Sequence, residues 1–515
     1  MSINVRLFFS ALILTLPWLN PFAPGPSPSV FPWLFTLGSF TAFLFIRMVR
    51  GHVLTLRLPA FWPYTADVFA TSMLAAGLFS TLMALLQYFD LEVIFFPWIN
   101  ATERGDAFAN LRQRNQFATL TSMAFVALMW FTAQQLQTSV ATKARNSGWF
   151  LAAAGLLAVG NAISSSRTGL FQLVLICGLY AAWWTLHVLT TRRLLICAVL
   201  VYTIAMFALP WATGLDMATH GAFARLGNDQ PCSSRLVLWS NVLHLIGQKP
   251  WLGWGWGELD YAHFITLYNE PRFCDILDNA HNLPLHLAVE LGVPAALLVC
   301  GGFAWWVMRQ KPWAERDADR QMAWAVMAVI LLHSVLEYPL WYGPFQISFG
   351  LCLFILWCRP KRATSPVTGL DYASNTLIAS SNPALTATKL IILTSFLVAI
   401  AYAAWDYHRV SQIYIQPEER HAAYQQDTLA HARKSWLFAD QALFAELILT
   451  SLSPETAAWT YISASHLLHY SPEPRVVQKL IESAVILGKD AEALAYLARF
   501  KAAFPKEHAS WAKAI

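Results

Sequence analysis

The chain has 515 residues, of which 57% are apolar and only 13% are charged. A soluble globular chain carries about 25% charged residues, so this composition excludes an ordinary soluble protein and indicates many membrane spans. The net charge is +5. No basic run carries the interleaved aromatic residues typical of nucleic-acid binding, which excludes a nucleic-acid partner.

Apolar runs of sufficient length predict about eleven helices that cross a bilayer. The predicted spans are residues 7–20, 30–48, 65–88, 116–134, 147–163, 168–189, 194–212, 283–307, 321–339, 343–358 and 387–405. The first run is short enough for a signal sequence, but no clear small-residue cleavage site follows it, so we predict a span there. The predicted fold class is therefore all-α, a polytopic membrane helix bundle.

Basic residues in the connecting loops predict the orientation of the bundle. With a cytoplasmic N-terminus, every inner loop carries Lys or Arg, as the positive-inside rule requires. The inner loops carry Arg47, Arg50, Arg57, Lys143, Arg145, Arg192, Arg193, Arg309, Lys311, Arg316, Arg320, Arg359, Lys361 and Arg362. This orientation predicts that residues 89–115, residues 214–282 and the chain after about residue 406 lie outside.

Cysteine positions agree with an oxidising outer compartment. Cys232 and Cys274 lie in the long outer loop, whereas the other five cysteines lie in or at the ends of predicted spans. The two loop cysteines can pair there, and two free thiols are the alternative. The sequence has no CxxC and no His/Cys metal spacing, so we predict no metal.

Four arginines lie on the predicted outer side next to span ends, where the positive-inside rule disfavours them. They are Arg112, Arg114, Arg167 and Arg235. Guanidinium groups make forked contacts with phosphate oxygens, so such a set suits an anionic lipid head group and a diphosphate above all. For each arginine alone, the alternative is an interfacial side chain that reaches lipid phosphates.

The long outer loop contains the alternating segment Gly253-Trp254-Gly255-Trp256-Gly257. Its backbone is flexible and its tryptophans are flat and amphipathic. Such side chains stack against sugar rings or rest at the lipid interface, and the sequence leaves both interpretations open.

The segment from Asp278 to Gly292 is the most informative part of the chain, because it opens an apolar helix with polar, titratable residues. His281 and Asn282 lie where this helix leaves the aqueous phase, and packing explains them poorly. A histidine can take a proton from an attacking hydroxyl near neutral pH, while arginines stabilise charge on a departing diphosphate. The alternative is a histidine that only makes a structural hydrogen bond.

Three further polar residues lie near the same predicted face. Glu337 and Tyr338 lie at the outer end of the span 321–339, and Asp278 precedes His281. We predict that they orient a donor or an acceptor. For Glu337 and Tyr338 the alternative is a capping and interfacial pair.

Residues 406–515 have no spanning run and read as several amphipathic helices. Small and large residues alternate in 491–500 as in stacked helical hairpins, which predicts a tetratricopeptide-like helical domain. The predicted domains are thus 1–405 in the membrane and 406–515 outside it. The outer domain either docks an acceptor or acts as a stabilising lid.

These residues resemble a known family. His281-Asn282 followed ten residues later by Gly292, together with the Ser-Arg-Thr link at 166–168, is similar to the O-antigen ligase and polymerase superfamily. More narrowly, Asn110-Leu-Arg-Gln-Arg-Asn-Gln-Phe-Ala-Thr119 and Asp278-Asn-Ala-His-Asn-Leu283 resemble the bacterial pilin-type O-oligosaccharyltransferases. The proline-rich N-terminal segment also resembles that subfamily, but Ala23 stands where a histidine is expected.

The resemblance implies a metal-independent, GT-C-like membrane glycosyltransferase that needs no cofactor. Such enzymes move a preassembled glycan from undecaprenyl diphosphate to an acceptor on the periplasmic side of the bacterial inner membrane. It implies that His281 is catalytic and that Arg167 and Arg235 hold the diphosphate, with less defined roles for Arg112 and Gln113. The predicted acceptor is a Ser or Thr of a periplasmic protein such as a pilin; lipid A core or a growing glycan are alternatives.

A transporter or flippase for an anionic lipid or solute is a candidate from another class. It would place charges near the bilayer midplane and would show related halves of the chain. Here the candidate charges gather at one predicted face and no internal repeat is visible, so the sequence favours an enzyme.

Overall fold

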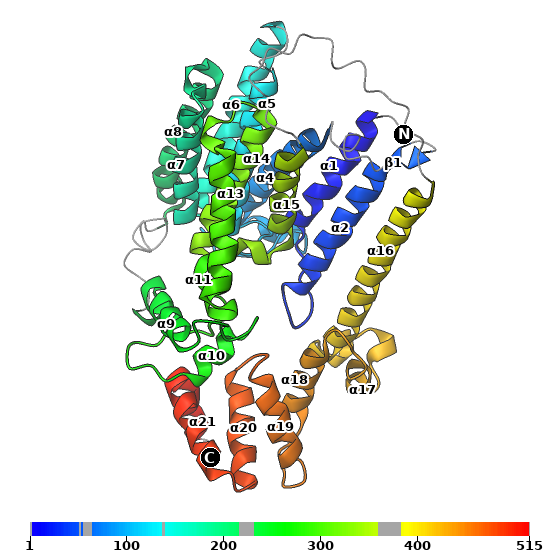
Figure 1. Ribbon diagram of the computed structural model, residues 1–515, viewed down its shortest axis with the longest axis vertical. Coiled ribbons are helices and arrows are strands. Elements are labelled where there is room, and N and C mark those ends of the chain that lie inside the picture. The colour runs from blue at the N-terminus through cyan, green and yellow to red at the C-terminus, as the bar shows by residue number, and fades with distance from the viewer. Residues whose placement is uncertain are drawn as a thin grey trace.

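The computed structural model describes residues 3–50, 53–54, 64–135, 140–215, 231–358 and 383–513. A bundle of long helices forms one end of the molecule and shorter C-terminal helices form the other (Figure 1). The one strand pair in the described residues joins Val49–Arg50 to Val53–Leu54 in antiparallel register. Residues 216–230 of the predicted outer loop, and the inner-loop residues Arg57, Arg359, Lys361 and Arg362, lie outside the described residues.

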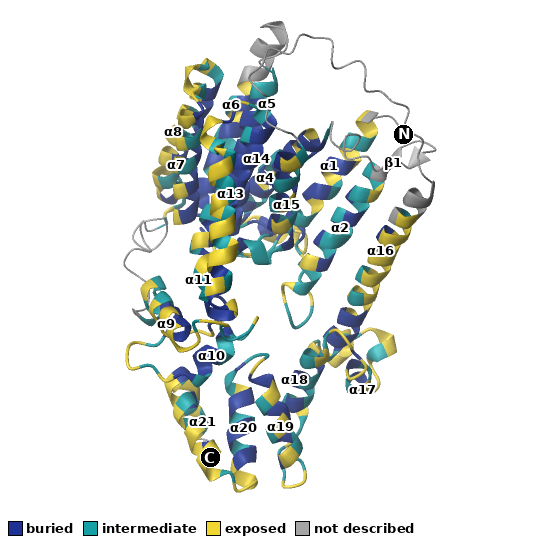
Figure 2. Cartoon of the chain, viewed as in Figure 1, coloured by how far each residue is buried: buried dark blue, intermediate teal, exposed yellow. Residues whose placement is uncertain are grey.

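The bundle is built around α5, which is mostly apolar and buried along most of its length. A helix of this kind belongs in the centre of a bundle. The helices that form the bundle are α1 (Ile3–Leu19), α2 (Val30–Met48), α4 (Thr65–Tyr88), α5 (Arg114–Gln135), α6 (Val140–Ile163), α7 (Arg167–Ala182), α8 (Leu189–Thr213), α14 (Ala318–Leu336) and α15 (Gly343–Cys358). Peripheral helices such as α7 and α8 carry exposed apolar residues, and both contain many exposed positions (Figure 2).

Several described helices have the length and composition to cross a membrane. Five qualify fully: Val30–Arg47, Thr65–Tyr88, Arg114–Gln135, Leu189–Thr213 and Leu390–Tyr414. Four shorter apolar helices are Asn4–Leu19, Gly148–Ile163, Arg167–Ala182 and Gly343–Cys358. The chain is therefore a helical membrane protein, as predicted, while the count of eleven spans stays a prediction.

The predicted span 283–307 is not one continuous helix. It divides into α11 (Leu283–Leu291), α12 (Val293–Ala296), the π-helical turn η6 (Leu297–Gly301) and α13 (Gly302–Gln310). The break falls at Gly292, whose φ is +89° and whose added Cβ would lie 2.2 Å from the Trp251 carbonyl oxygen. We call residues 251–257 the Gly-Trp loop; its backbone lies directly against Gly292. Only glycine fits there, because it has no Cβ.

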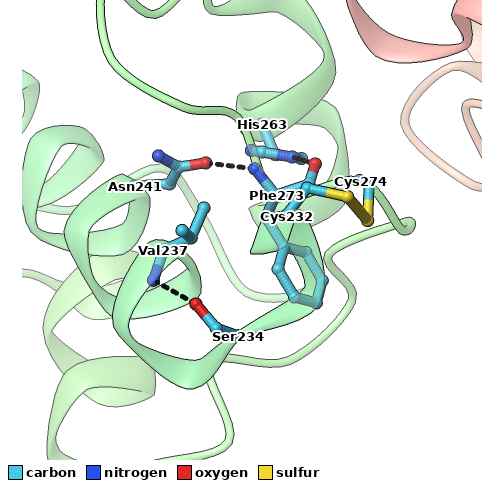
Figure 3. Close-up of a disulfide and its surroundings, with 7 residues drawn as sticks. All are labelled: Cys232, Ser234, Val237, Asn241, His263, Phe273 and Cys274. Carbon is cyan, nitrogen blue, oxygen red and sulfur yellow. Dashed lines mark hydrogen bonds between the residues drawn. A yellow bond between two sulfur atoms is a disulfide. The ribbon is translucent and has the colours of Figure 1, made fainter. Parts of the chain in front are cut away.

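The outer loop is held together by α9 (Arg235–Gln248), α10 (Leu259–Ile265) and a disulfide between Cys232 and Cys274, whose Cα atoms are 5.4 Å apart. Beside the disulfide, the Phe273 amide donates to the Asn241 side-chain oxygen at 2.8 Å (Figure 3). The disulfide thus fixes the start of α9, and with it Arg235.

The C-terminal helices form a core of their own. The long helix α16 (Pro383–Ser411) runs beside α2 and leads into them (Figure 1). They are α17 (Thr428–Ala432), α18 (Ala439–Leu449), α19 (Ala457–Leu467), α20 (Pro474–Ile486), α21 (Asp490–Ala503) and α22 (Pro505–Ala512). Phe264 of α10 is buried in this core, and Arg499 donates to the Ile265 carbonyl at 2.9 Å. The outer loop is therefore packed onto the C-terminal helices.

Candidate functional site

Glu337, directly after α14, is the point where side chains from several segments meet. One carboxylate oxygen lies 2.6 Å from His281 Nδ1, and the other forms an ion pair with Arg235. Gln113 and Asn115 also donate to this carboxylate, at 3.4 and 3.3 Å. The structure therefore brings together residues from α5, α9, the start of α11 and the end of α14.

The Glu337 carboxylate is buried, with 7% of its side chain exposed. Burial alone would raise the pKa of Glu337, but the hydrogen bond and charge of His281, together with Arg235 and His333, outweigh burial and lower it. Glu337 is thus a fixed negative charge at neutral pH, available to bind cations.

His281 has an unusual backbone conformation for a residue with a side chain. Its φ is +50°, and its amide donates to the Asn279 side-chain oxygen at 2.9 Å. Its ring packs edge-on against Tyr338, with centroids 4.9 Å apart. Strained backbone of this kind gathers at functional sites. Since Nδ1 is taken by Glu337, Nε2 is the nitrogen left to exchange a proton with a substrate.

Asn282 caps α11 and ties it to α14. Its side-chain oxygen accepts from the Leu285 amide at 3.1 Å, and its side-chain nitrogen donates to the Val335 carbonyl at 3.0 Å. Predicted as part of a catalytic pair, Asn282 has both ends of its amide in structural contacts. Its geometry suits positioning His281 rather than contacting a substrate.

Arg167 and Arg235 have the same local setting. Each is the first residue of a helix, preceded by a serine N-cap: Ser166 caps α7 and Ser234 caps α9. Helix N-termini and guanidinium groups both favour anions. Ser166 also donates to Asn115 at 2.6 Å, so Asn115 links the start of α7 to Glu337.

Arg112 and Arg114 make contacts elsewhere. Arg112, at φ +58°, donates to the Pro21 carbonyl, and burial lowers its pKa. Arg114 forms an ion pair with Asp106. Of the four predicted arginines, Arg235 pairs with Glu337 directly. Arg167 is linked to Glu337 only through its neighbour Ser166, which bonds Asn115. The N-terminal proline-rich segment supplies part of the scaffold under Arg112.

Asp278, Tyr338 and Tyr342 form an acidic and aromatic rim beside His281. Burial raises the pKa of Asp278, although its charge interaction with His281 opposes this. The Tyr338 and Tyr342 rings stack at 5.9 Å, and burial raises the pKa of both hydroxyls. Both phenols therefore stay protonated and can donate hydrogen bonds.

Several residues of this site could not be identified from the sequence. Asn115 and Ser166 stood out in the sequence only as parts of longer motifs, and Tyr342 and Trp341 did not stand out at all. Trp256 of the Gly-Trp loop stacks on Trp341 with ring planes 11° apart. A polar residue in the first turn of an apolar helix, as Asn115 is, was the one signal available from sequence.

A polar layer lies behind Glu337, inside the bundle. Thr119 lies 2.9 Å from His333 Nδ1 and accepts from Gln172 at 2.8 Å. All three side chains are fully or almost fully buried. Buried polar residues in a membrane bundle are costly and mark functional regions.

Three family models match parts of the chain. Residues 107–131 match a protein glycosylation ligase family, residues 150–300 an O-antigen ligase family, and residues 321–515 the C-terminal part of a virulence factor membrane-bound polymerase family. The matched segments include Gln113, Arg167, Arg235, His281 and Glu337 in turn.

Two proteins of Acinetobacter baylyi are similar to the chain. It is 24% identical over 287 residues to a ComP-specific O-oligosaccharyltransferase, covering 56% of this chain and 50% of that protein. It is 21% identical over 351 residues to a general O-oligosaccharyltransferase, covering 67% and 57%. The chain thus spans about half the length of these relatives. These comparisons confirm the resemblance predicted from the motifs, to the O-antigen ligase superfamily and its O-oligosaccharyltransferases.

Proposed function

We propose that the protein is a glycosyltransferase of the bacterial inner membrane, with its site and C-terminus in the periplasm. It transfers a preassembled oligosaccharide from undecaprenyl diphosphate to a Ser or Thr hydroxyl of a periplasmic protein such as a pilin. The observation that carries the proposal is the Glu337 carboxylate, which binds His281 through one oxygen and Arg235 through the other.

Glu337 and His281 act together as an oriented base. The carboxylate fixes Nδ1 of His281, so that Nε2 accepts the proton of the acceptor hydroxyl. The hydroxyl oxygen then forms a bond to the anomeric carbon. The bond between that carbon and the diphosphate oxygen breaks, and undecaprenyl diphosphate leaves with the electron pair.

Arg235 and Arg167 hold the diphosphate and stabilise the charge that grows on it. The Arg235 side chain is 39% exposed although it is paired with Glu337. A guanidinium has five N–H donors, so Arg235 can keep Glu337 and still bind phosphate oxygens. Arg167 is exposed at the start of α7. The paired helix N-termini add to the attraction.

The acceptor assignment is supported by the relatives, both of which are named O-oligosaccharyltransferases. We propose residues 406–515 as the domain that docks the acceptor, since these helices pack against α10 of the outer loop. The polymerase-family match over 321–515 favours a second candidate, the extension of a growing glycan. A ligase acting on lipid A core would share the same chemistry.

The test is reconstitution in bacteria that make one defined undecaprenyl-linked glycan and lack their own ligase. The protein is co-expressed with a type IV pilin from the same genome, as wild type, as His281→Ala, and as the control His187→Ala. His187 lies in the short connection between α7 and α8 and is exposed. Intact mass spectrometry of the pilin is the readout.

The proposal expects the glycan mass on the pilin with wild type and His187→Ala, and none with His281→Ala. Glycan on lipid A core, or longer chains, would move the assignment to ligase or polymerase. Movement of labelled donor lipid across a vesicle membrane, with no covalent product, would indicate a transporter. Full transfer by His281→Ala would overturn the role of that residue.

A further inference from the structure

Residues 91–98, shortly after α4, have an inverted arrangement of charged and apolar side chains, and we call them the outer apolar segment. Val93, Ile94 and Phe96 are 68%, 74% and 74% exposed. Glu92, the one charged residue of the segment, is only 1% exposed. In water, charged side chains are normally exposed and large apolar side chains are normally buried. The inversion indicates that this segment faces apolar surroundings.

Hydrogen bonds hold the segment in this arrangement. The Glu92 carboxylate accepts from the Thr102 amide at 3.3 Å, which keeps the charge turned toward the protein. The Asn110 side chain donates to the Trp98 carbonyl at 2.9 Å and to the Leu19 carbonyl at 2.8 Å. Because both ends of the segment are bound to the rest of the bundle, the exposure of its apolar side chains is a property of the fold.

The segment lies at the level where two spanning helices end. The 24 residues of α4 correspond to about 36 Å at about 1.5 Å per residue, enough to cross a hydrocarbon core about 30 Å thick. This helix ends at Tyr88, just before the segment. Trp98, at the end of the segment, packs edge-on against Phe22 with ring centroids 5.7 Å apart. Phe22 follows the end of α1 at Leu19, so the helix ends and the segment share one membrane boundary.

The exposed apolar face of α4 continues into the segment. Phe79, Leu82 and Phe89 are 55%, 48% and 42% exposed. Their spacing of three and seven residues places them on one face of the helix. Since the exposed apolar face of a spanning helix lies against lipid, the same lipid surface reaches the residues that follow Phe89.

A third helix end lies beside the loop that follows the segment. The Arg104 side chain donates to the Thr213 carbonyl at 3.2 Å, at the end of α8. Trp211, two residues earlier, is 80% exposed. Phe22, Trp98 and Trp211 thus mark the ends of three spanning helices with aromatic side chains. Aromatic residues at this level are typical of the boundary between lipid and water.

We propose that the outer apolar segment binds the phospholipid surface, in the outer leaflet, at the boundary between head groups and acyl chains. The inference does not depend on the proposed activity, because it concerns only the contact with lipid. Asn110 binds the Trp98 carbonyl, and Gln113, three residues later, donates to Glu337. The segment therefore fixes the depth of the Glu337 cluster relative to the membrane surface.

Photolabelling of the full chain in vesicles of phosphatidylethanolamine and phosphatidylglycerol tests the lipid contact. The vesicles contain a phospholipid with an aryl diazirine either next to the head group or at the end of an acyl chain. Labelled peptides are mapped by mass spectrometry. Ile462 of α19 and Leu494 of α21 are the matched controls, because they are apolar and 68% and 66% exposed but belong to the C-terminal helices.

We expect the head-group probe to label the segment about tenfold more than the peptides that contain Ile462 and Leu494, because apolar side chains at the interface favour lipid over water. The head-group probe should also label the segment more than the chain-end probe does. Equal labelling of the segment and the two controls would overturn the proposal. Stronger labelling by the chain-end probe would overturn the interfacial position.

A double variant, Ile94→Ser/Phe96→Ser, tests whether these side chains hold the segment in the lipid. Labelling of the segment by the head-group probe should fall by about fivefold, since most of the exposed apolar area is lost. Ile462→Ser is the control and should leave this labelling unchanged. Unchanged labelling in a double variant that unfolds at the wild-type temperature would contradict the role of Ile94 and Phe96.

A protein partner for the same surface is the alternative outcome. A purified type IV pilin is added to the vesicles at increasing concentration before photolysis. Labelling of the segment that stays constant supports the lipid surface. Labelling that falls with pilin concentration, while the labelling of α4 stays constant, would make the segment a docking surface for a protein and would overturn the lipid assignment.

Discussion

Two buried carboxylates, Glu337 after α14 and Asp406 near the end of α16, each bind an arginine, yet they are built differently. Asp406 is fully buried and its partner Arg409 is 8% exposed. The other contacts of Asp406 come from one segment about 30 residues further along the chain: the Ser435 hydroxyl at 2.9 Å and the amides of residues 436 and 437. Glu337 binds side chains only, and its partners Arg235 and His281 remain 39% and 18% exposed.

The difference indicates what each carboxylate is for. Backbone amides and a buried arginine satisfy Asp406, so it joins α16 to the C-terminal helices and offers nothing to a ligand. Glu337 holds its partners at a surface, and one of them, His281, has a strained backbone. The exposure and strain of the partners separate a binding site from a structural joint, although both contain the same ion pair.

The largest effect should come from breaking the Glu337 cluster. In His281→Ala and Glu337→Ala, we expect the rate of glycan transfer to fall by about 10²–10⁴-fold, because the acceptor hydroxyl loses its oriented base. His187→Ala, in the exposed connection between α7 and α8, is the control and should keep the wild-type rate. Initial rates of glycan transfer with purified protein measure this loss. A Glu337→Ala variant that keeps the wild-type rate would contradict the role of Glu337 in orienting His281.

Breaking the joint should instead cost stability. Asp406→Ala leaves Arg409 buried without its carboxylate, so the free energy of unfolding of the C-terminal helices should fall by about 3–5 kcal/mol. The exposed pair Arg433–Glu446 should contribute less than about 1 kcal/mol. Limited proteolysis after α16 reports the loss. KM for the donor should stay unchanged in the folded fraction, and a raised KM would mean that the two regions are coupled.

The sequence predicted the helical membrane bundle because a membrane-spanning segment can be recognised from a local property, a long apolar run. It also pointed to His281 and Arg235, because a charge at a helix end is visible in one dimension. It could not predict that the Glu337 carboxylate contacts both residues. Nor could it predict that Gln113 and Asn115, which are more than 200 residues away in the chain, donate to the same carboxylate. Nor could it predict the break at Gly292, which depends on the Trp251 carbonyl.

A smaller effect on KM should come from Asn115, which links Glu337 to the start of α7. Asn115 connects Glu337 with Ser166, the cap of the helix that begins at Arg167. Removing the side chain of Asn115 or that of Arg167 should therefore raise KM for the donor about tenfold. The double variant Asn115→Ala/Arg167→Ala should show a coupling of about 1 kcal/mol rather than additivity. Thr132→Ala, whose hydroxyl only bonds its own helix, should be additive with Arg167→Ala. If the effects of Asn115→Ala and Arg167→Ala are additive, the two residues are not linked.

The smallest effect concerns a third carboxylate, Asp260, which forms no ion pair within the described part of the chain. Burial raises its pKa to about 7, with help from the nearby charges of Asp278 and Glu258. Because the folded protein favours the protonated form, Asp260 lowers stability progressively as pH rises from about 4 to about 7.

Asp260→Asn should therefore raise the free energy of unfolding near pH 8 and leave it almost unchanged near pH 4. Thermal unfolding of both proteins across this range measures the difference. A gain of equal size at both pH values would mean that the asparagine improves packing or helix capping, and that the charge of Asp260 is not the cause. A gain confined to high pH would complete the comparison, since a buried carboxylate with no arginine costs stability where Asp406 adds it.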